Sequence, residues 1–237
     1  MKNFSKNPKE INVESFFETF RKAYLFYQKK EFNLTKNDGE GRMFARTLCA
    51  YFLQKNGFYK SPILNKKSVP NLEKGLVVIG NYGTGKTSIF NTFHLMFFNA
   101  FREGIIVKLK DENLINIGHF KLNFGFHSSN GIVREYECLK LPEERNTFWK
   151  KYGNGTRYFD DLTTEHQASN FGKIELFKDI LEARYSNKTK TFISLNFHGN
   201  SVEETLDFLA EKYGERVYDR LFEMFNIIEL KGKSFRE

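Results

Sequence analysis

The sequence predicts an α/β protein, with a parallel β-sheet flanked by helices and a small helical appendage at the N-terminus. Short apolar runs typical of buried strands alternate with segments whose apolar residues recur at helical spacing. One of these runs, residues 75–79, leads through a glycine-rich loop directly into a helical pattern. Upstream, residues 1–70 show two helical patterns and a connector. We therefore expect a helical N-terminal region (residues 1–70) for partner binding and a second domain (residues 71–237) built on the sheet.

Composition limits the class of protein. Of 237 residues, 40% are hydrophobic and 28% are charged, so a sizeable core is expected and global disorder is not. No apolar run approaches the roughly 18 residues of a membrane span, and the basic N-terminus lacks an apolar signal segment. Cys49 and Cys138 lie far apart, and the five histidines show no metal-binding spacing. We expect a cytoplasmic protein without membrane contact or structural metal.

The formal net charge of +8 suggests an anionic partner, and nucleic acid is the obvious candidate. A second explanation competes with this one. The chain is rich in Lys, Asn, Phe and Ile together, a composition that an AT-rich genome produces without selection for DNA binding. Charge alone leaves both explanations open.

The N-terminal region contains two predicted helices. Asn12 is a suitable N-cap for a helix over residues 13–30, whose aromatic side chains recur every three or four residues. A second helix is expected over residues 42–54. Residues 57–74 contain a glycine and two prolines and are expected to be a connector. The aromatic stripe of the first helix is interpreted as core or docking surface, with base stacking as the alternative.

The glycine-rich loop carries the strongest motif. It follows a strand, precedes a helix and has the form G-x-x-x-x-G-K-[ST] of a phosphate-binding P-loop. Its residues, with the one that follows, are Gly80, Asn81, Tyr82, Gly83, Thr84, Gly85, Lys86, Thr87 and Ser88. The three glycines allow positive φ, so that backbone N–H groups approach phosphate oxygens. Lys86 is expected to reach the β- and γ-phosphates, and the Thr87 hydroxyl to bind Mg²⁺. The loop thus predicts binding of ATP or GTP with Mg²⁺.

Residues 104–150 give weaker patterns. Residues 105–109 are interpreted as a strand, residues 112–120 as a short helix and residues 135–141 as another strand. All three are assigned to the nucleotide-binding domain.

A pair of acids follows the next short apolar run. Tyr158 and Phe159 precede Asp160 and Asp161, which gives the form of a Walker B element. In that interpretation Asp160 holds the Mg²⁺ through water, and Asp161 orients the attacking water as general base. Two carboxylates at the carboxyl end of a strand would face the crevice of an open α/β sheet. The alternative is an acidic turn that caps the following helix.

The remaining elements complete an alternating pattern. We expect helices over residues 173–185, 202–212 and 215–224, and strands over residues 191–195 and 226–230. The first of these strands ends at Asn196, which is either a polar residue near the γ-phosphate or an ordinary turn residue. Alternating helices and strands around a P-loop predict a doubly wound sheet.

Taken together, these motifs resemble a known family. Residues 80–87, 160–165, 194–196, 218–224 and 230–236 look like those of the DnaC-type helicase loaders, AAA+ ATPases of the replication-initiator group. The IstB-type transposition ATPases share much of the pattern. The resemblance runs from about Gly75 to the last residue, and its D-D-L-x-x-E and R-L-x-E-M segments are more selective than the P-loop.

The resemblance implies further residue roles. Asn196 corresponds to sensor 1, and Arg220 to an arginine finger offered to a neighbouring subunit. Arg216 is a rival finger, and a purely salt-bridging role for Arg220 is the other alternative. Thr163 replaces the family's usual glycine. Only 17 residues follow Arg220 (237 − 220), too few for the helical lid of ordinary AAA+ proteins, which the loaders also lack. The zinc-binding N-terminal region of some loaders is absent from this sequence.

On this basis we expect an ATP-hydrolysing AAA+ protein with a core that lacks the helical lid. It would use ATP and Mg²⁺, with Lys86, Asp161, Asn196 and Arg220 as its catalytic residues. Its partners would be single-stranded DNA, a replicative helicase and further copies of itself, joined through Arg220. Three alternatives remain: an IstB-type helper acting with a transposase on duplex DNA, a small-molecule kinase, and a binding module whose ATP site is a switch with negligible turnover.

Overall fold

The computed structural model describes residues 6–169 and 172–234. The chain forms two compact units. The first contains the described residues up to 63, residues 83–124 and residues 232–234, and the second contains residues 64–82 and 125–231. Each unit therefore draws on separate stretches of the chain. The expected division into an N-terminal region over residues 1–70 and a second domain over residues 71–237 stays a prediction.

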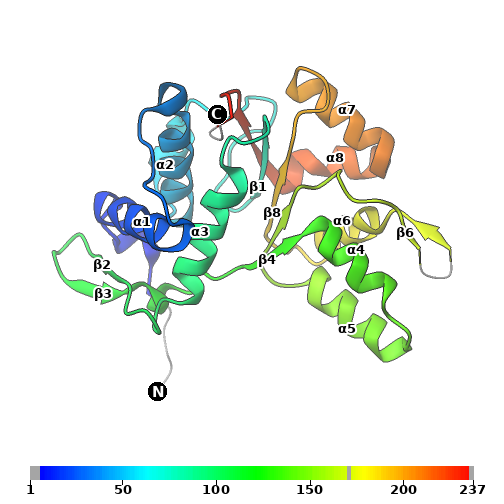
Figure 1. Ribbon diagram of the computed structural model, residues 1–237, viewed down its shortest axis with the longest axis horizontal. Coiled ribbons are helices and arrows are strands. Elements are labelled where there is room, and N and C mark those ends of the chain that lie inside the picture. The colour runs from blue at the N-terminus through cyan, green and yellow to red at the C-terminus, as the bar shows by residue number, and fades with distance from the viewer. Residues whose placement is uncertain (1–5, 170–171, 235–237) are drawn as a thin grey trace. The chain divides into compact units, whose positions relative to one another are not determined.

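The second unit is built on a parallel five-stranded sheet (Figure 1). Its strand order is β4-β5-β8-β1-β9, and every neighbouring pair is parallel. The strands are β1 (Gly75–Gly80), β4 (Gly125–Ser128), β5 (Arg157–Asp160), β8 (Thr191–Leu195) and β9 (Phe225–Leu230). The predicted α/β class with a parallel sheet is confirmed. Since all five strands run the same way, their carboxyl ends lie at one edge.

The central strands are apolar because they are covered on both faces. Every residue of β1 and β8 is buried, as expected for interior strands of a parallel sheet. The first residue of β1 must be a glycine: a Cβ at Gly75 would lie 1.9 Å from the carbonyl oxygen of Thr191. The two central strands thus approach closely at their amino ends.

Five helices of the second unit pack with the sheet around one apolar core that includes Phe159, Phe177, Ile193 and Leu206. They are α4 (Ser129–Glu137), α5 (Pro142–Gly153), α6 (Leu176–Ser186), α7 (Val202–Tyr213) and α8 (Glu215–Met224). The two-residue strands β6 (Ala168–Ser169) and β7 (Lys173–Ile174) form a small antiparallel pair.

A buried arginine joins several of these elements. Arg184 of α6 donates to the Thr191 hydroxyl and to the carbonyl oxygens of Tyr152, Gly155 and Lys190, at 2.7 to 2.8 Å. Burial lowers the pKa of this guanidinium to about 9. The charged group is accommodated because polar acceptors surround it. Through these bonds Arg184 fixes the two segments that lead into β5 and β8.

The first unit is helical, with one hairpin. Its helices are α1 (Val13–Gln28), α2 (Glu40–Phe52) and α3 (Lys86–Phe98), and its hairpin pairs β2 (Ile106–Lys108) with β3 (Leu114–Asn116). Short 3₁₀ helices are η1 (Pro8–Glu10), η2 (Lys36–Gly39), η3 (Asn56–Lys60) and η4 (Ile117–Phe120). As expected, the Asn12 side chain caps α1, accepting the N–H groups of Glu14 and Ser15.

The aromatic stripe of α1 is core. Phe16 and Phe20 are fully buried and stack on Phe93 of α3, with centroids 6.0 and 4.5 Å apart. Phe52 of α2 joins them, 5.1 Å from Phe93. Buried aromatic pairs of this kind contribute about 0.5–1.5 kcal/mol beyond the area that they bury. They attach α3 to the N-terminal helices.

Residues 112–141 differ from the sequence prediction. Instead of one short helix, residues 114–120 form β3 and η4, and the strand expected from residue 135 is wrong because α4 continues to Glu137. Ser128 starts that helix: its hydroxyl accepts the N–H of Gly131. The alternating polar and apolar residues after position 135 imitate a strand, but Ile132, Val133 and Tyr136 place a helical face on the core.

No helix in the described parts of the chain is long and apolar enough to cross a membrane.

Candidate nucleotide-binding site

The loop between β1 and α3 has the backbone expected of a P-loop at two of its three glycines. Gly83 and Gly85 have φ of 75° and 84°, values that residues with a side chain rarely adopt. Gly80 differs: it is the last residue of β1 and pairs with Leu230 of β9, so the expected positive φ is wrong there. The left-handed turns are therefore concentrated in the second half of the loop.

The helix after the loop begins at the lysine of the motif. Lys86 is the first residue of α3 and is buried, Thr87 is the second and is exposed, and Gly85 is the N-cap. The first N–H groups of a helix lack intrahelical partners, and the helix dipole adds partial positive charge. The Ser88 hydroxyl is directed back to the Gly85 carbonyl at 3.1 Å, so it stabilises the turn. This helix start is suited to an anion such as a phosphate.

The two predicted acids lie at the sheet edge where β1 also ends. Asp160 is the last residue of β5 and Gly80 the last of β1, and β8 lies between these strands. At about 4.8 Å per strand, the two strands are about 10 Å apart. A parallel sheet binds its ligands at the carboxyl ends of its strands. The structure thus brings the start of the loop and the acids to one edge.

Asp160 is held by two hydroxyl groups. Its Oδ1 accepts hydrogen bonds from the Tyr158 hydroxyl at 2.6 Å and the Ser194 hydroxyl at 2.7 Å. All three side chains are buried. Burial, together with the neighbouring Asp160 carboxylate, raises the pKa of Tyr158 well above its usual value, so the phenol remains a donor.

Asp161 occupies a tight turn beside β8. Its φ is 53°, its N–H points to the Ser194 hydroxyl at 3.3 Å, and the next N–H, of Leu162, bonds the Ser194 carbonyl at 2.9 Å. The amide of Asn196 donates to Asp161 Oδ1 at 3.5 Å. Sequence reasoning placed both side chains near the γ-phosphate, and the structure places them side by side. The next helix, α6, has Glu175 as its N-cap, so the acidic pair does not cap it.

An ion pair with a buried carboxylate anchors the segment after the acids, and sequence reasoning did not foresee it. Glu165 is paired with Lys212 of α7 at 2.9 Å and accepts a hydrogen bond from the Tyr213 hydroxyl. Lys212 also donates to the Thr163 carbonyl at 3.2 Å. Burial and the Glu165 carboxylate raise the pKa of Tyr213 far above its usual value. The partners lie 47 residues apart in sequence, so only the fold brings them together.

The proposed finger and its rival differ in exposure. Arg220 is packed over the ring of Tyr185, 4.3 Å from its centroid, and its side chain is 17% exposed. Arg216, one turn earlier on α8, is 70% exposed. Both lie 4.0 Å from Glu182. Arg220 therefore has contacts within its own chain, while Arg216 extends into solvent; the assignment of the finger stays a prediction.

The last described residues lie along the loop. The backbone N–H and side-chain amide of Asn81 donate to the carbonyls of Leu230 and Lys231, at 3.3 and 3.2 Å. Ser234 packs on Gly83 so closely that a Cβ on the glycine would lie 2.3 Å from its hydroxyl oxygen. Of the motif over residues 230–236, positions 235 and 236 lie outside the described residues.

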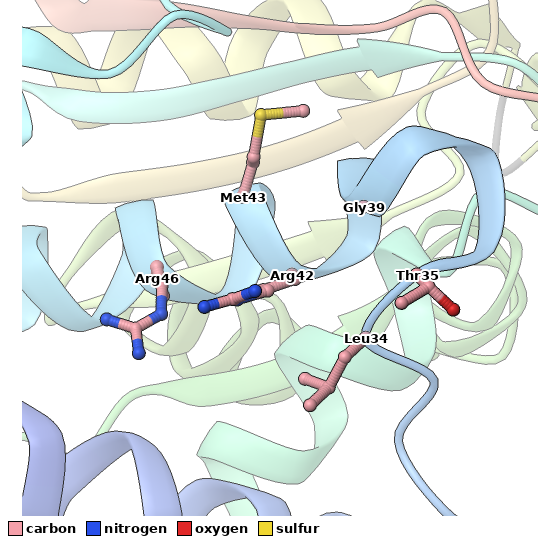
Figure 2. A pocket seen from close by; sticks show the side chains of 6 residues that line it. All are labelled: Leu34, Thr35, Gly39, Arg42, Met43 and Arg46. Atoms are coloured by element: carbon pink, nitrogen blue, oxygen red, sulfur yellow. The ribbon is translucent and has the colours of Figure 1, made fainter.

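The first unit also has a pocket of about 560 Å³ on α2 (Figure 2). Its lining residues are Leu34, Thr35, Gly39, Arg42, Met43 and Arg46. Its two arginines, Arg42 and Arg46, come from consecutive turns of α2. Arg46 is already bound by Glu14 through two hydrogen bonds of 2.7 and 2.8 Å, which neutralises part of the pocket's charge.

Thr87 and Asp160 fit Mg²⁺ by their chemistry. The Thr87 hydroxyl and the Asp160 carboxylate are hard oxygen donors of the kind that Mg²⁺ prefers, and Gly83 and Gly85 give the loop the positive φ that phosphate-binding loops use. The parallel sheet, with a glycine loop leading from β1 into α3, defines an α/β protein with a P-loop NTPase fold.

Several solved structures are similar to this chain, and two of them are described here. One is the DnaC helicase loader, with 23% sequence identity and a TM-score of 0.46, covering 66% of this chain and 78% of the other. The other is DnaI, with 18% identity and a TM-score of 0.47, covering 85% of this chain and 88% of the other. The sequence matches no family model. It also matches no curated protein.

Proposed function

We propose that this protein is a P-loop ATPase that binds ATP with Mg²⁺ in the loop between β1 and α3. The observation that carries the proposal is the backbone of that loop. Gly83 and Gly85 turn through left-handed conformations directly before a helix that starts with Lys86 and Thr87. Such a turn directs N–H groups towards a bound anion, and the helix start adds its dipole.

In this proposal each residue of the site has a defined role. Lys86 would bind the β- and γ-phosphates, and Thr87 and Asp160 would hold Mg²⁺, whose charge would offset that of the phosphates. Asp161 orients the attacking water and accepts its proton. Asn196, whose amide is 3.5 Å from Asp161, keeps that carboxylate directed at the site and reports the γ-phosphate. The neighbouring backbone N–H groups bind phosphate oxygens.

The biological role that we propose is that of a helicase loader. The support is the sequence resemblance to DnaC-type loaders in the segments around Asp160 and Arg220, together with a net charge of +8 that suits DNA. The protein would assemble on single-stranded DNA, complete each ATP site with an arginine of the next subunit and act on a replicative helicase. The alternative, a transposition helper on duplex DNA, has the same ATP site and a different partner.

Two variants test the ATP site. Lys86→Ala should abolish binding of a fluorescent ATP analogue, because the phosphates lose their cation. Asp161→Asn should bind the analogue and lose phosphate release, because only the water-orienting step is affected. Lys178→Ala and Asp207→Asn, exposed residues of α6 and α7, are the matched controls and should behave as wild type. ATP hydrolysis by Asp161→Asn at the wild-type rate would refute the proposed role of Asp161 in orienting the attacking water.

Oligonucleotide binding tests the DNA role. Affinity should fall steeply as salt rises, because Lys and Arg displace condensed counterions, and it should increase with ATP if assembly aligns several basic surfaces. Anisotropy with single-stranded and duplex oligonucleotides of equal length separates the two roles. A preference for the single strand supports the loader, and a preference for duplex supports the transposition helper. Binding that ignores both salt and nucleotide would contradict a DNA function.

A further inference from the structure

Two buried hydroxyls converge on one carboxylate oxygen at the sheet edge. Tyr158 lies two residues before Asp160 on β5, and Ser194 lies on the neighbouring strand β8. Both hydroxyls are within 2.7 Å of Asp160 Oδ1, and they are 2.8 Å from each other. Tyr158 and Ser194 have no exposed surface. Of the three polar groups, Asp160 alone keeps some exposed surface, 7%.

The proton inventory shows that the hydroxyls need the carboxylate as an acceptor. Each hydroxyl has one proton. A hydrogen bond between Tyr158 and Ser194 at 2.8 Å would use only one of the two protons, so at least one proton goes to Asp160. Asp160 Oδ1 lies 2.6 and 2.7 Å from the two hydroxyl oxygens and can accept from both, while the Ser194 oxygen accepts the N–H of Asp161 at 3.3 Å. The donors thus fix the direction of this carboxylate oxygen.

The hydroxyl of Ser194 also fixes the second acid. The same residue that donates to Asp160 receives the N–H of Asp161 through its hydroxyl and the N–H of Leu162 through its carbonyl. One residue of β8 therefore sets the position of both acids relative to the sheet. Tyr158 is fixed in turn by its ring, which packs on Phe126 with centroids 4.7 Å apart.

We propose that Tyr158 and Ser194 are positioning residues for the Mg²⁺ site. They hold the Asp160 carboxylate in one orientation, so that it receives the hydrated cation of a Mg–nucleotide complex without reorganisation. Groups that orient metal-binding side chains typically affect metal affinity about 10- to 100-fold. This inference rests on the proposed ATP site and adds the residues that set its affinity for the cation.

The variants remove one hydroxyl at a time. Tyr158→Phe keeps the ring on Phe126 and loses only the donor to Asp160. Ser194→Ala loses the second donor, and Ser194→Thr keeps a hydroxyl at that position and should restore the wild-type behaviour. Tyr152→Phe is the matched control: its hydroxyl also donates to a carboxylate, that of Glu135 at 2.7 Å, but on helix α5 and outside the sheet edge.

The measurement is Mg²⁺ titration of fluorescent ADP binding, which does not depend on hydrolysis. We expect Tyr158→Phe and Ser194→Ala each to raise the Mg²⁺ concentration for half-maximal tightening about tenfold, with little change in the affinity measured in chelator. Tyr152→Phe should leave the titration unchanged. Melting temperatures of all variants are recorded alongside.

Three outcomes decide the inference. A tenfold shift in both variants with rescue by Ser194→Thr supports it. A lower melting temperature with an unchanged Mg²⁺ titration, in a wild type that responds to Mg²⁺, assigns the hydroxyls to core stability alone and overturns the inference while leaving the ATP site intact. Nucleotide binding by the wild type that ignores Mg²⁺ overturns the proposed metal site, and the inference with it.

Discussion

The carboxylate of Glu40 accepts the backbone N–H of Gly232 through both of its oxygens, at 3.0 and 2.9 Å. Glu40 is the first residue of α2, where the helix dipole favours a negative charge. It is buried, and its partner is 192 residues away in sequence. Since Ser234, two residues further on, packs on Gly83, the contact fixes the segment that lies along the glycine loop.

Glu40→Ala should therefore destabilise the fold. Hydrogen bonds to a charged group contribute about 1.5–3 kcal/mol, and the variant also leaves the Gly232 N–H without this acceptor. We expect a loss of about 2 kcal/mol in the free energy of unfolding, measured by urea denaturation. Glu31→Ala, at an exposed position after α1, is the control and should change stability by less than about 0.5 kcal/mol. Equal stability of the two variants would show that the contact contributes nothing.

Thr163 adopts a backbone conformation that suits glycine. Its φ is 80°, which is a genuine outlier for a β-branched residue. The DnaC-type loaders that the sequence resembles usually have glycine at this position. Thr163→Gly should remove strain of about 1 kcal/mol and raise the melting temperature by a few degrees. Thr164→Gly is the control in the same turn: it removes the hydroxyl bond to the Asp161 carbonyl at 2.7 Å and should destabilise. A destabilised Thr163→Gly protein would show that no strain is stored there.

The sequence predicted those parts of the fold that depend on local chemistry. Strand β1, the glycine loop and the start of α3 were foreseen because φ > 0, strand burial and helix entry each require particular residue types within a few positions. Asp160, Asp161 and Asn196 were placed at strand ends for the same reason. Tertiary partners were not foreseen: the Glu165–Lys212 pair joins segments 47 residues apart, and its register depends on how α7 packs.

The sequence pattern also gave a wrong prediction where one segment fits both the period of a strand and that of a helix. After residue 135 the polar and apolar residues alternate, which favours a strand, but Ser128 starts a helix upstream and α4 continues through the alternation. A positive φ was expected at Gly80 because the motif contains three glycines. Its pairing with Leu230 shows that β1 extends over that residue, so the ladder decides its conformation.

His94 should make stability depend on pH. Its Nδ1 donates to the Phe124 carbonyl at 2.8 Å, and burial lowers its pKa below the usual value. The unfolded chain therefore binds more protons than the folded chain once the pH falls below about 6.5, and stability is lost as the pH falls towards the lower folded pKa. Unfolding free energies at pH 7.5 and 5.5 should differ less in His94→Gln than in wild type. His119→Gln, at an exposed ring, is the control; equal pH dependence in His94→Gln and wild type would contradict the assignment.

A shared ATP site separates an assembling ATPase from a kinase whose site lies within one chain. In the proposed assembly, the phosphates are held by the loop of one subunit and the developing charge is met by an arginine of the next, a contribution of about 10³–10⁵ in rate. Lys86→Ala and Arg220→Ala should each be nearly inactive alone, for different reasons. Mixed, some interfaces pair an intact loop with an intact finger, so phosphate release should partly recover, most visibly with DNA present.

The exposure of the two arginines makes the same experiment discriminate between them. Arg220 is stacked on Tyr185 and 17% exposed, so using it as a finger requires it to leave that ring, whereas Arg216 is 70% exposed. Each arginine variant is mixed separately with Lys86→Ala over a range of ratios, and circular dichroism establishes that every variant is folded. Recovery with Arg220→Ala identifies Arg220 as the finger that the sequence predicts. If Arg216→Ala is the only arginine variant that is inactive by itself and recovers on mixing, the finger lies one turn earlier. Arg220 then contributes to packing against α6. The absence of recovery in both mixtures would exclude the shared site, because an interface with both intact halves would then be unable to hydrolyse ATP.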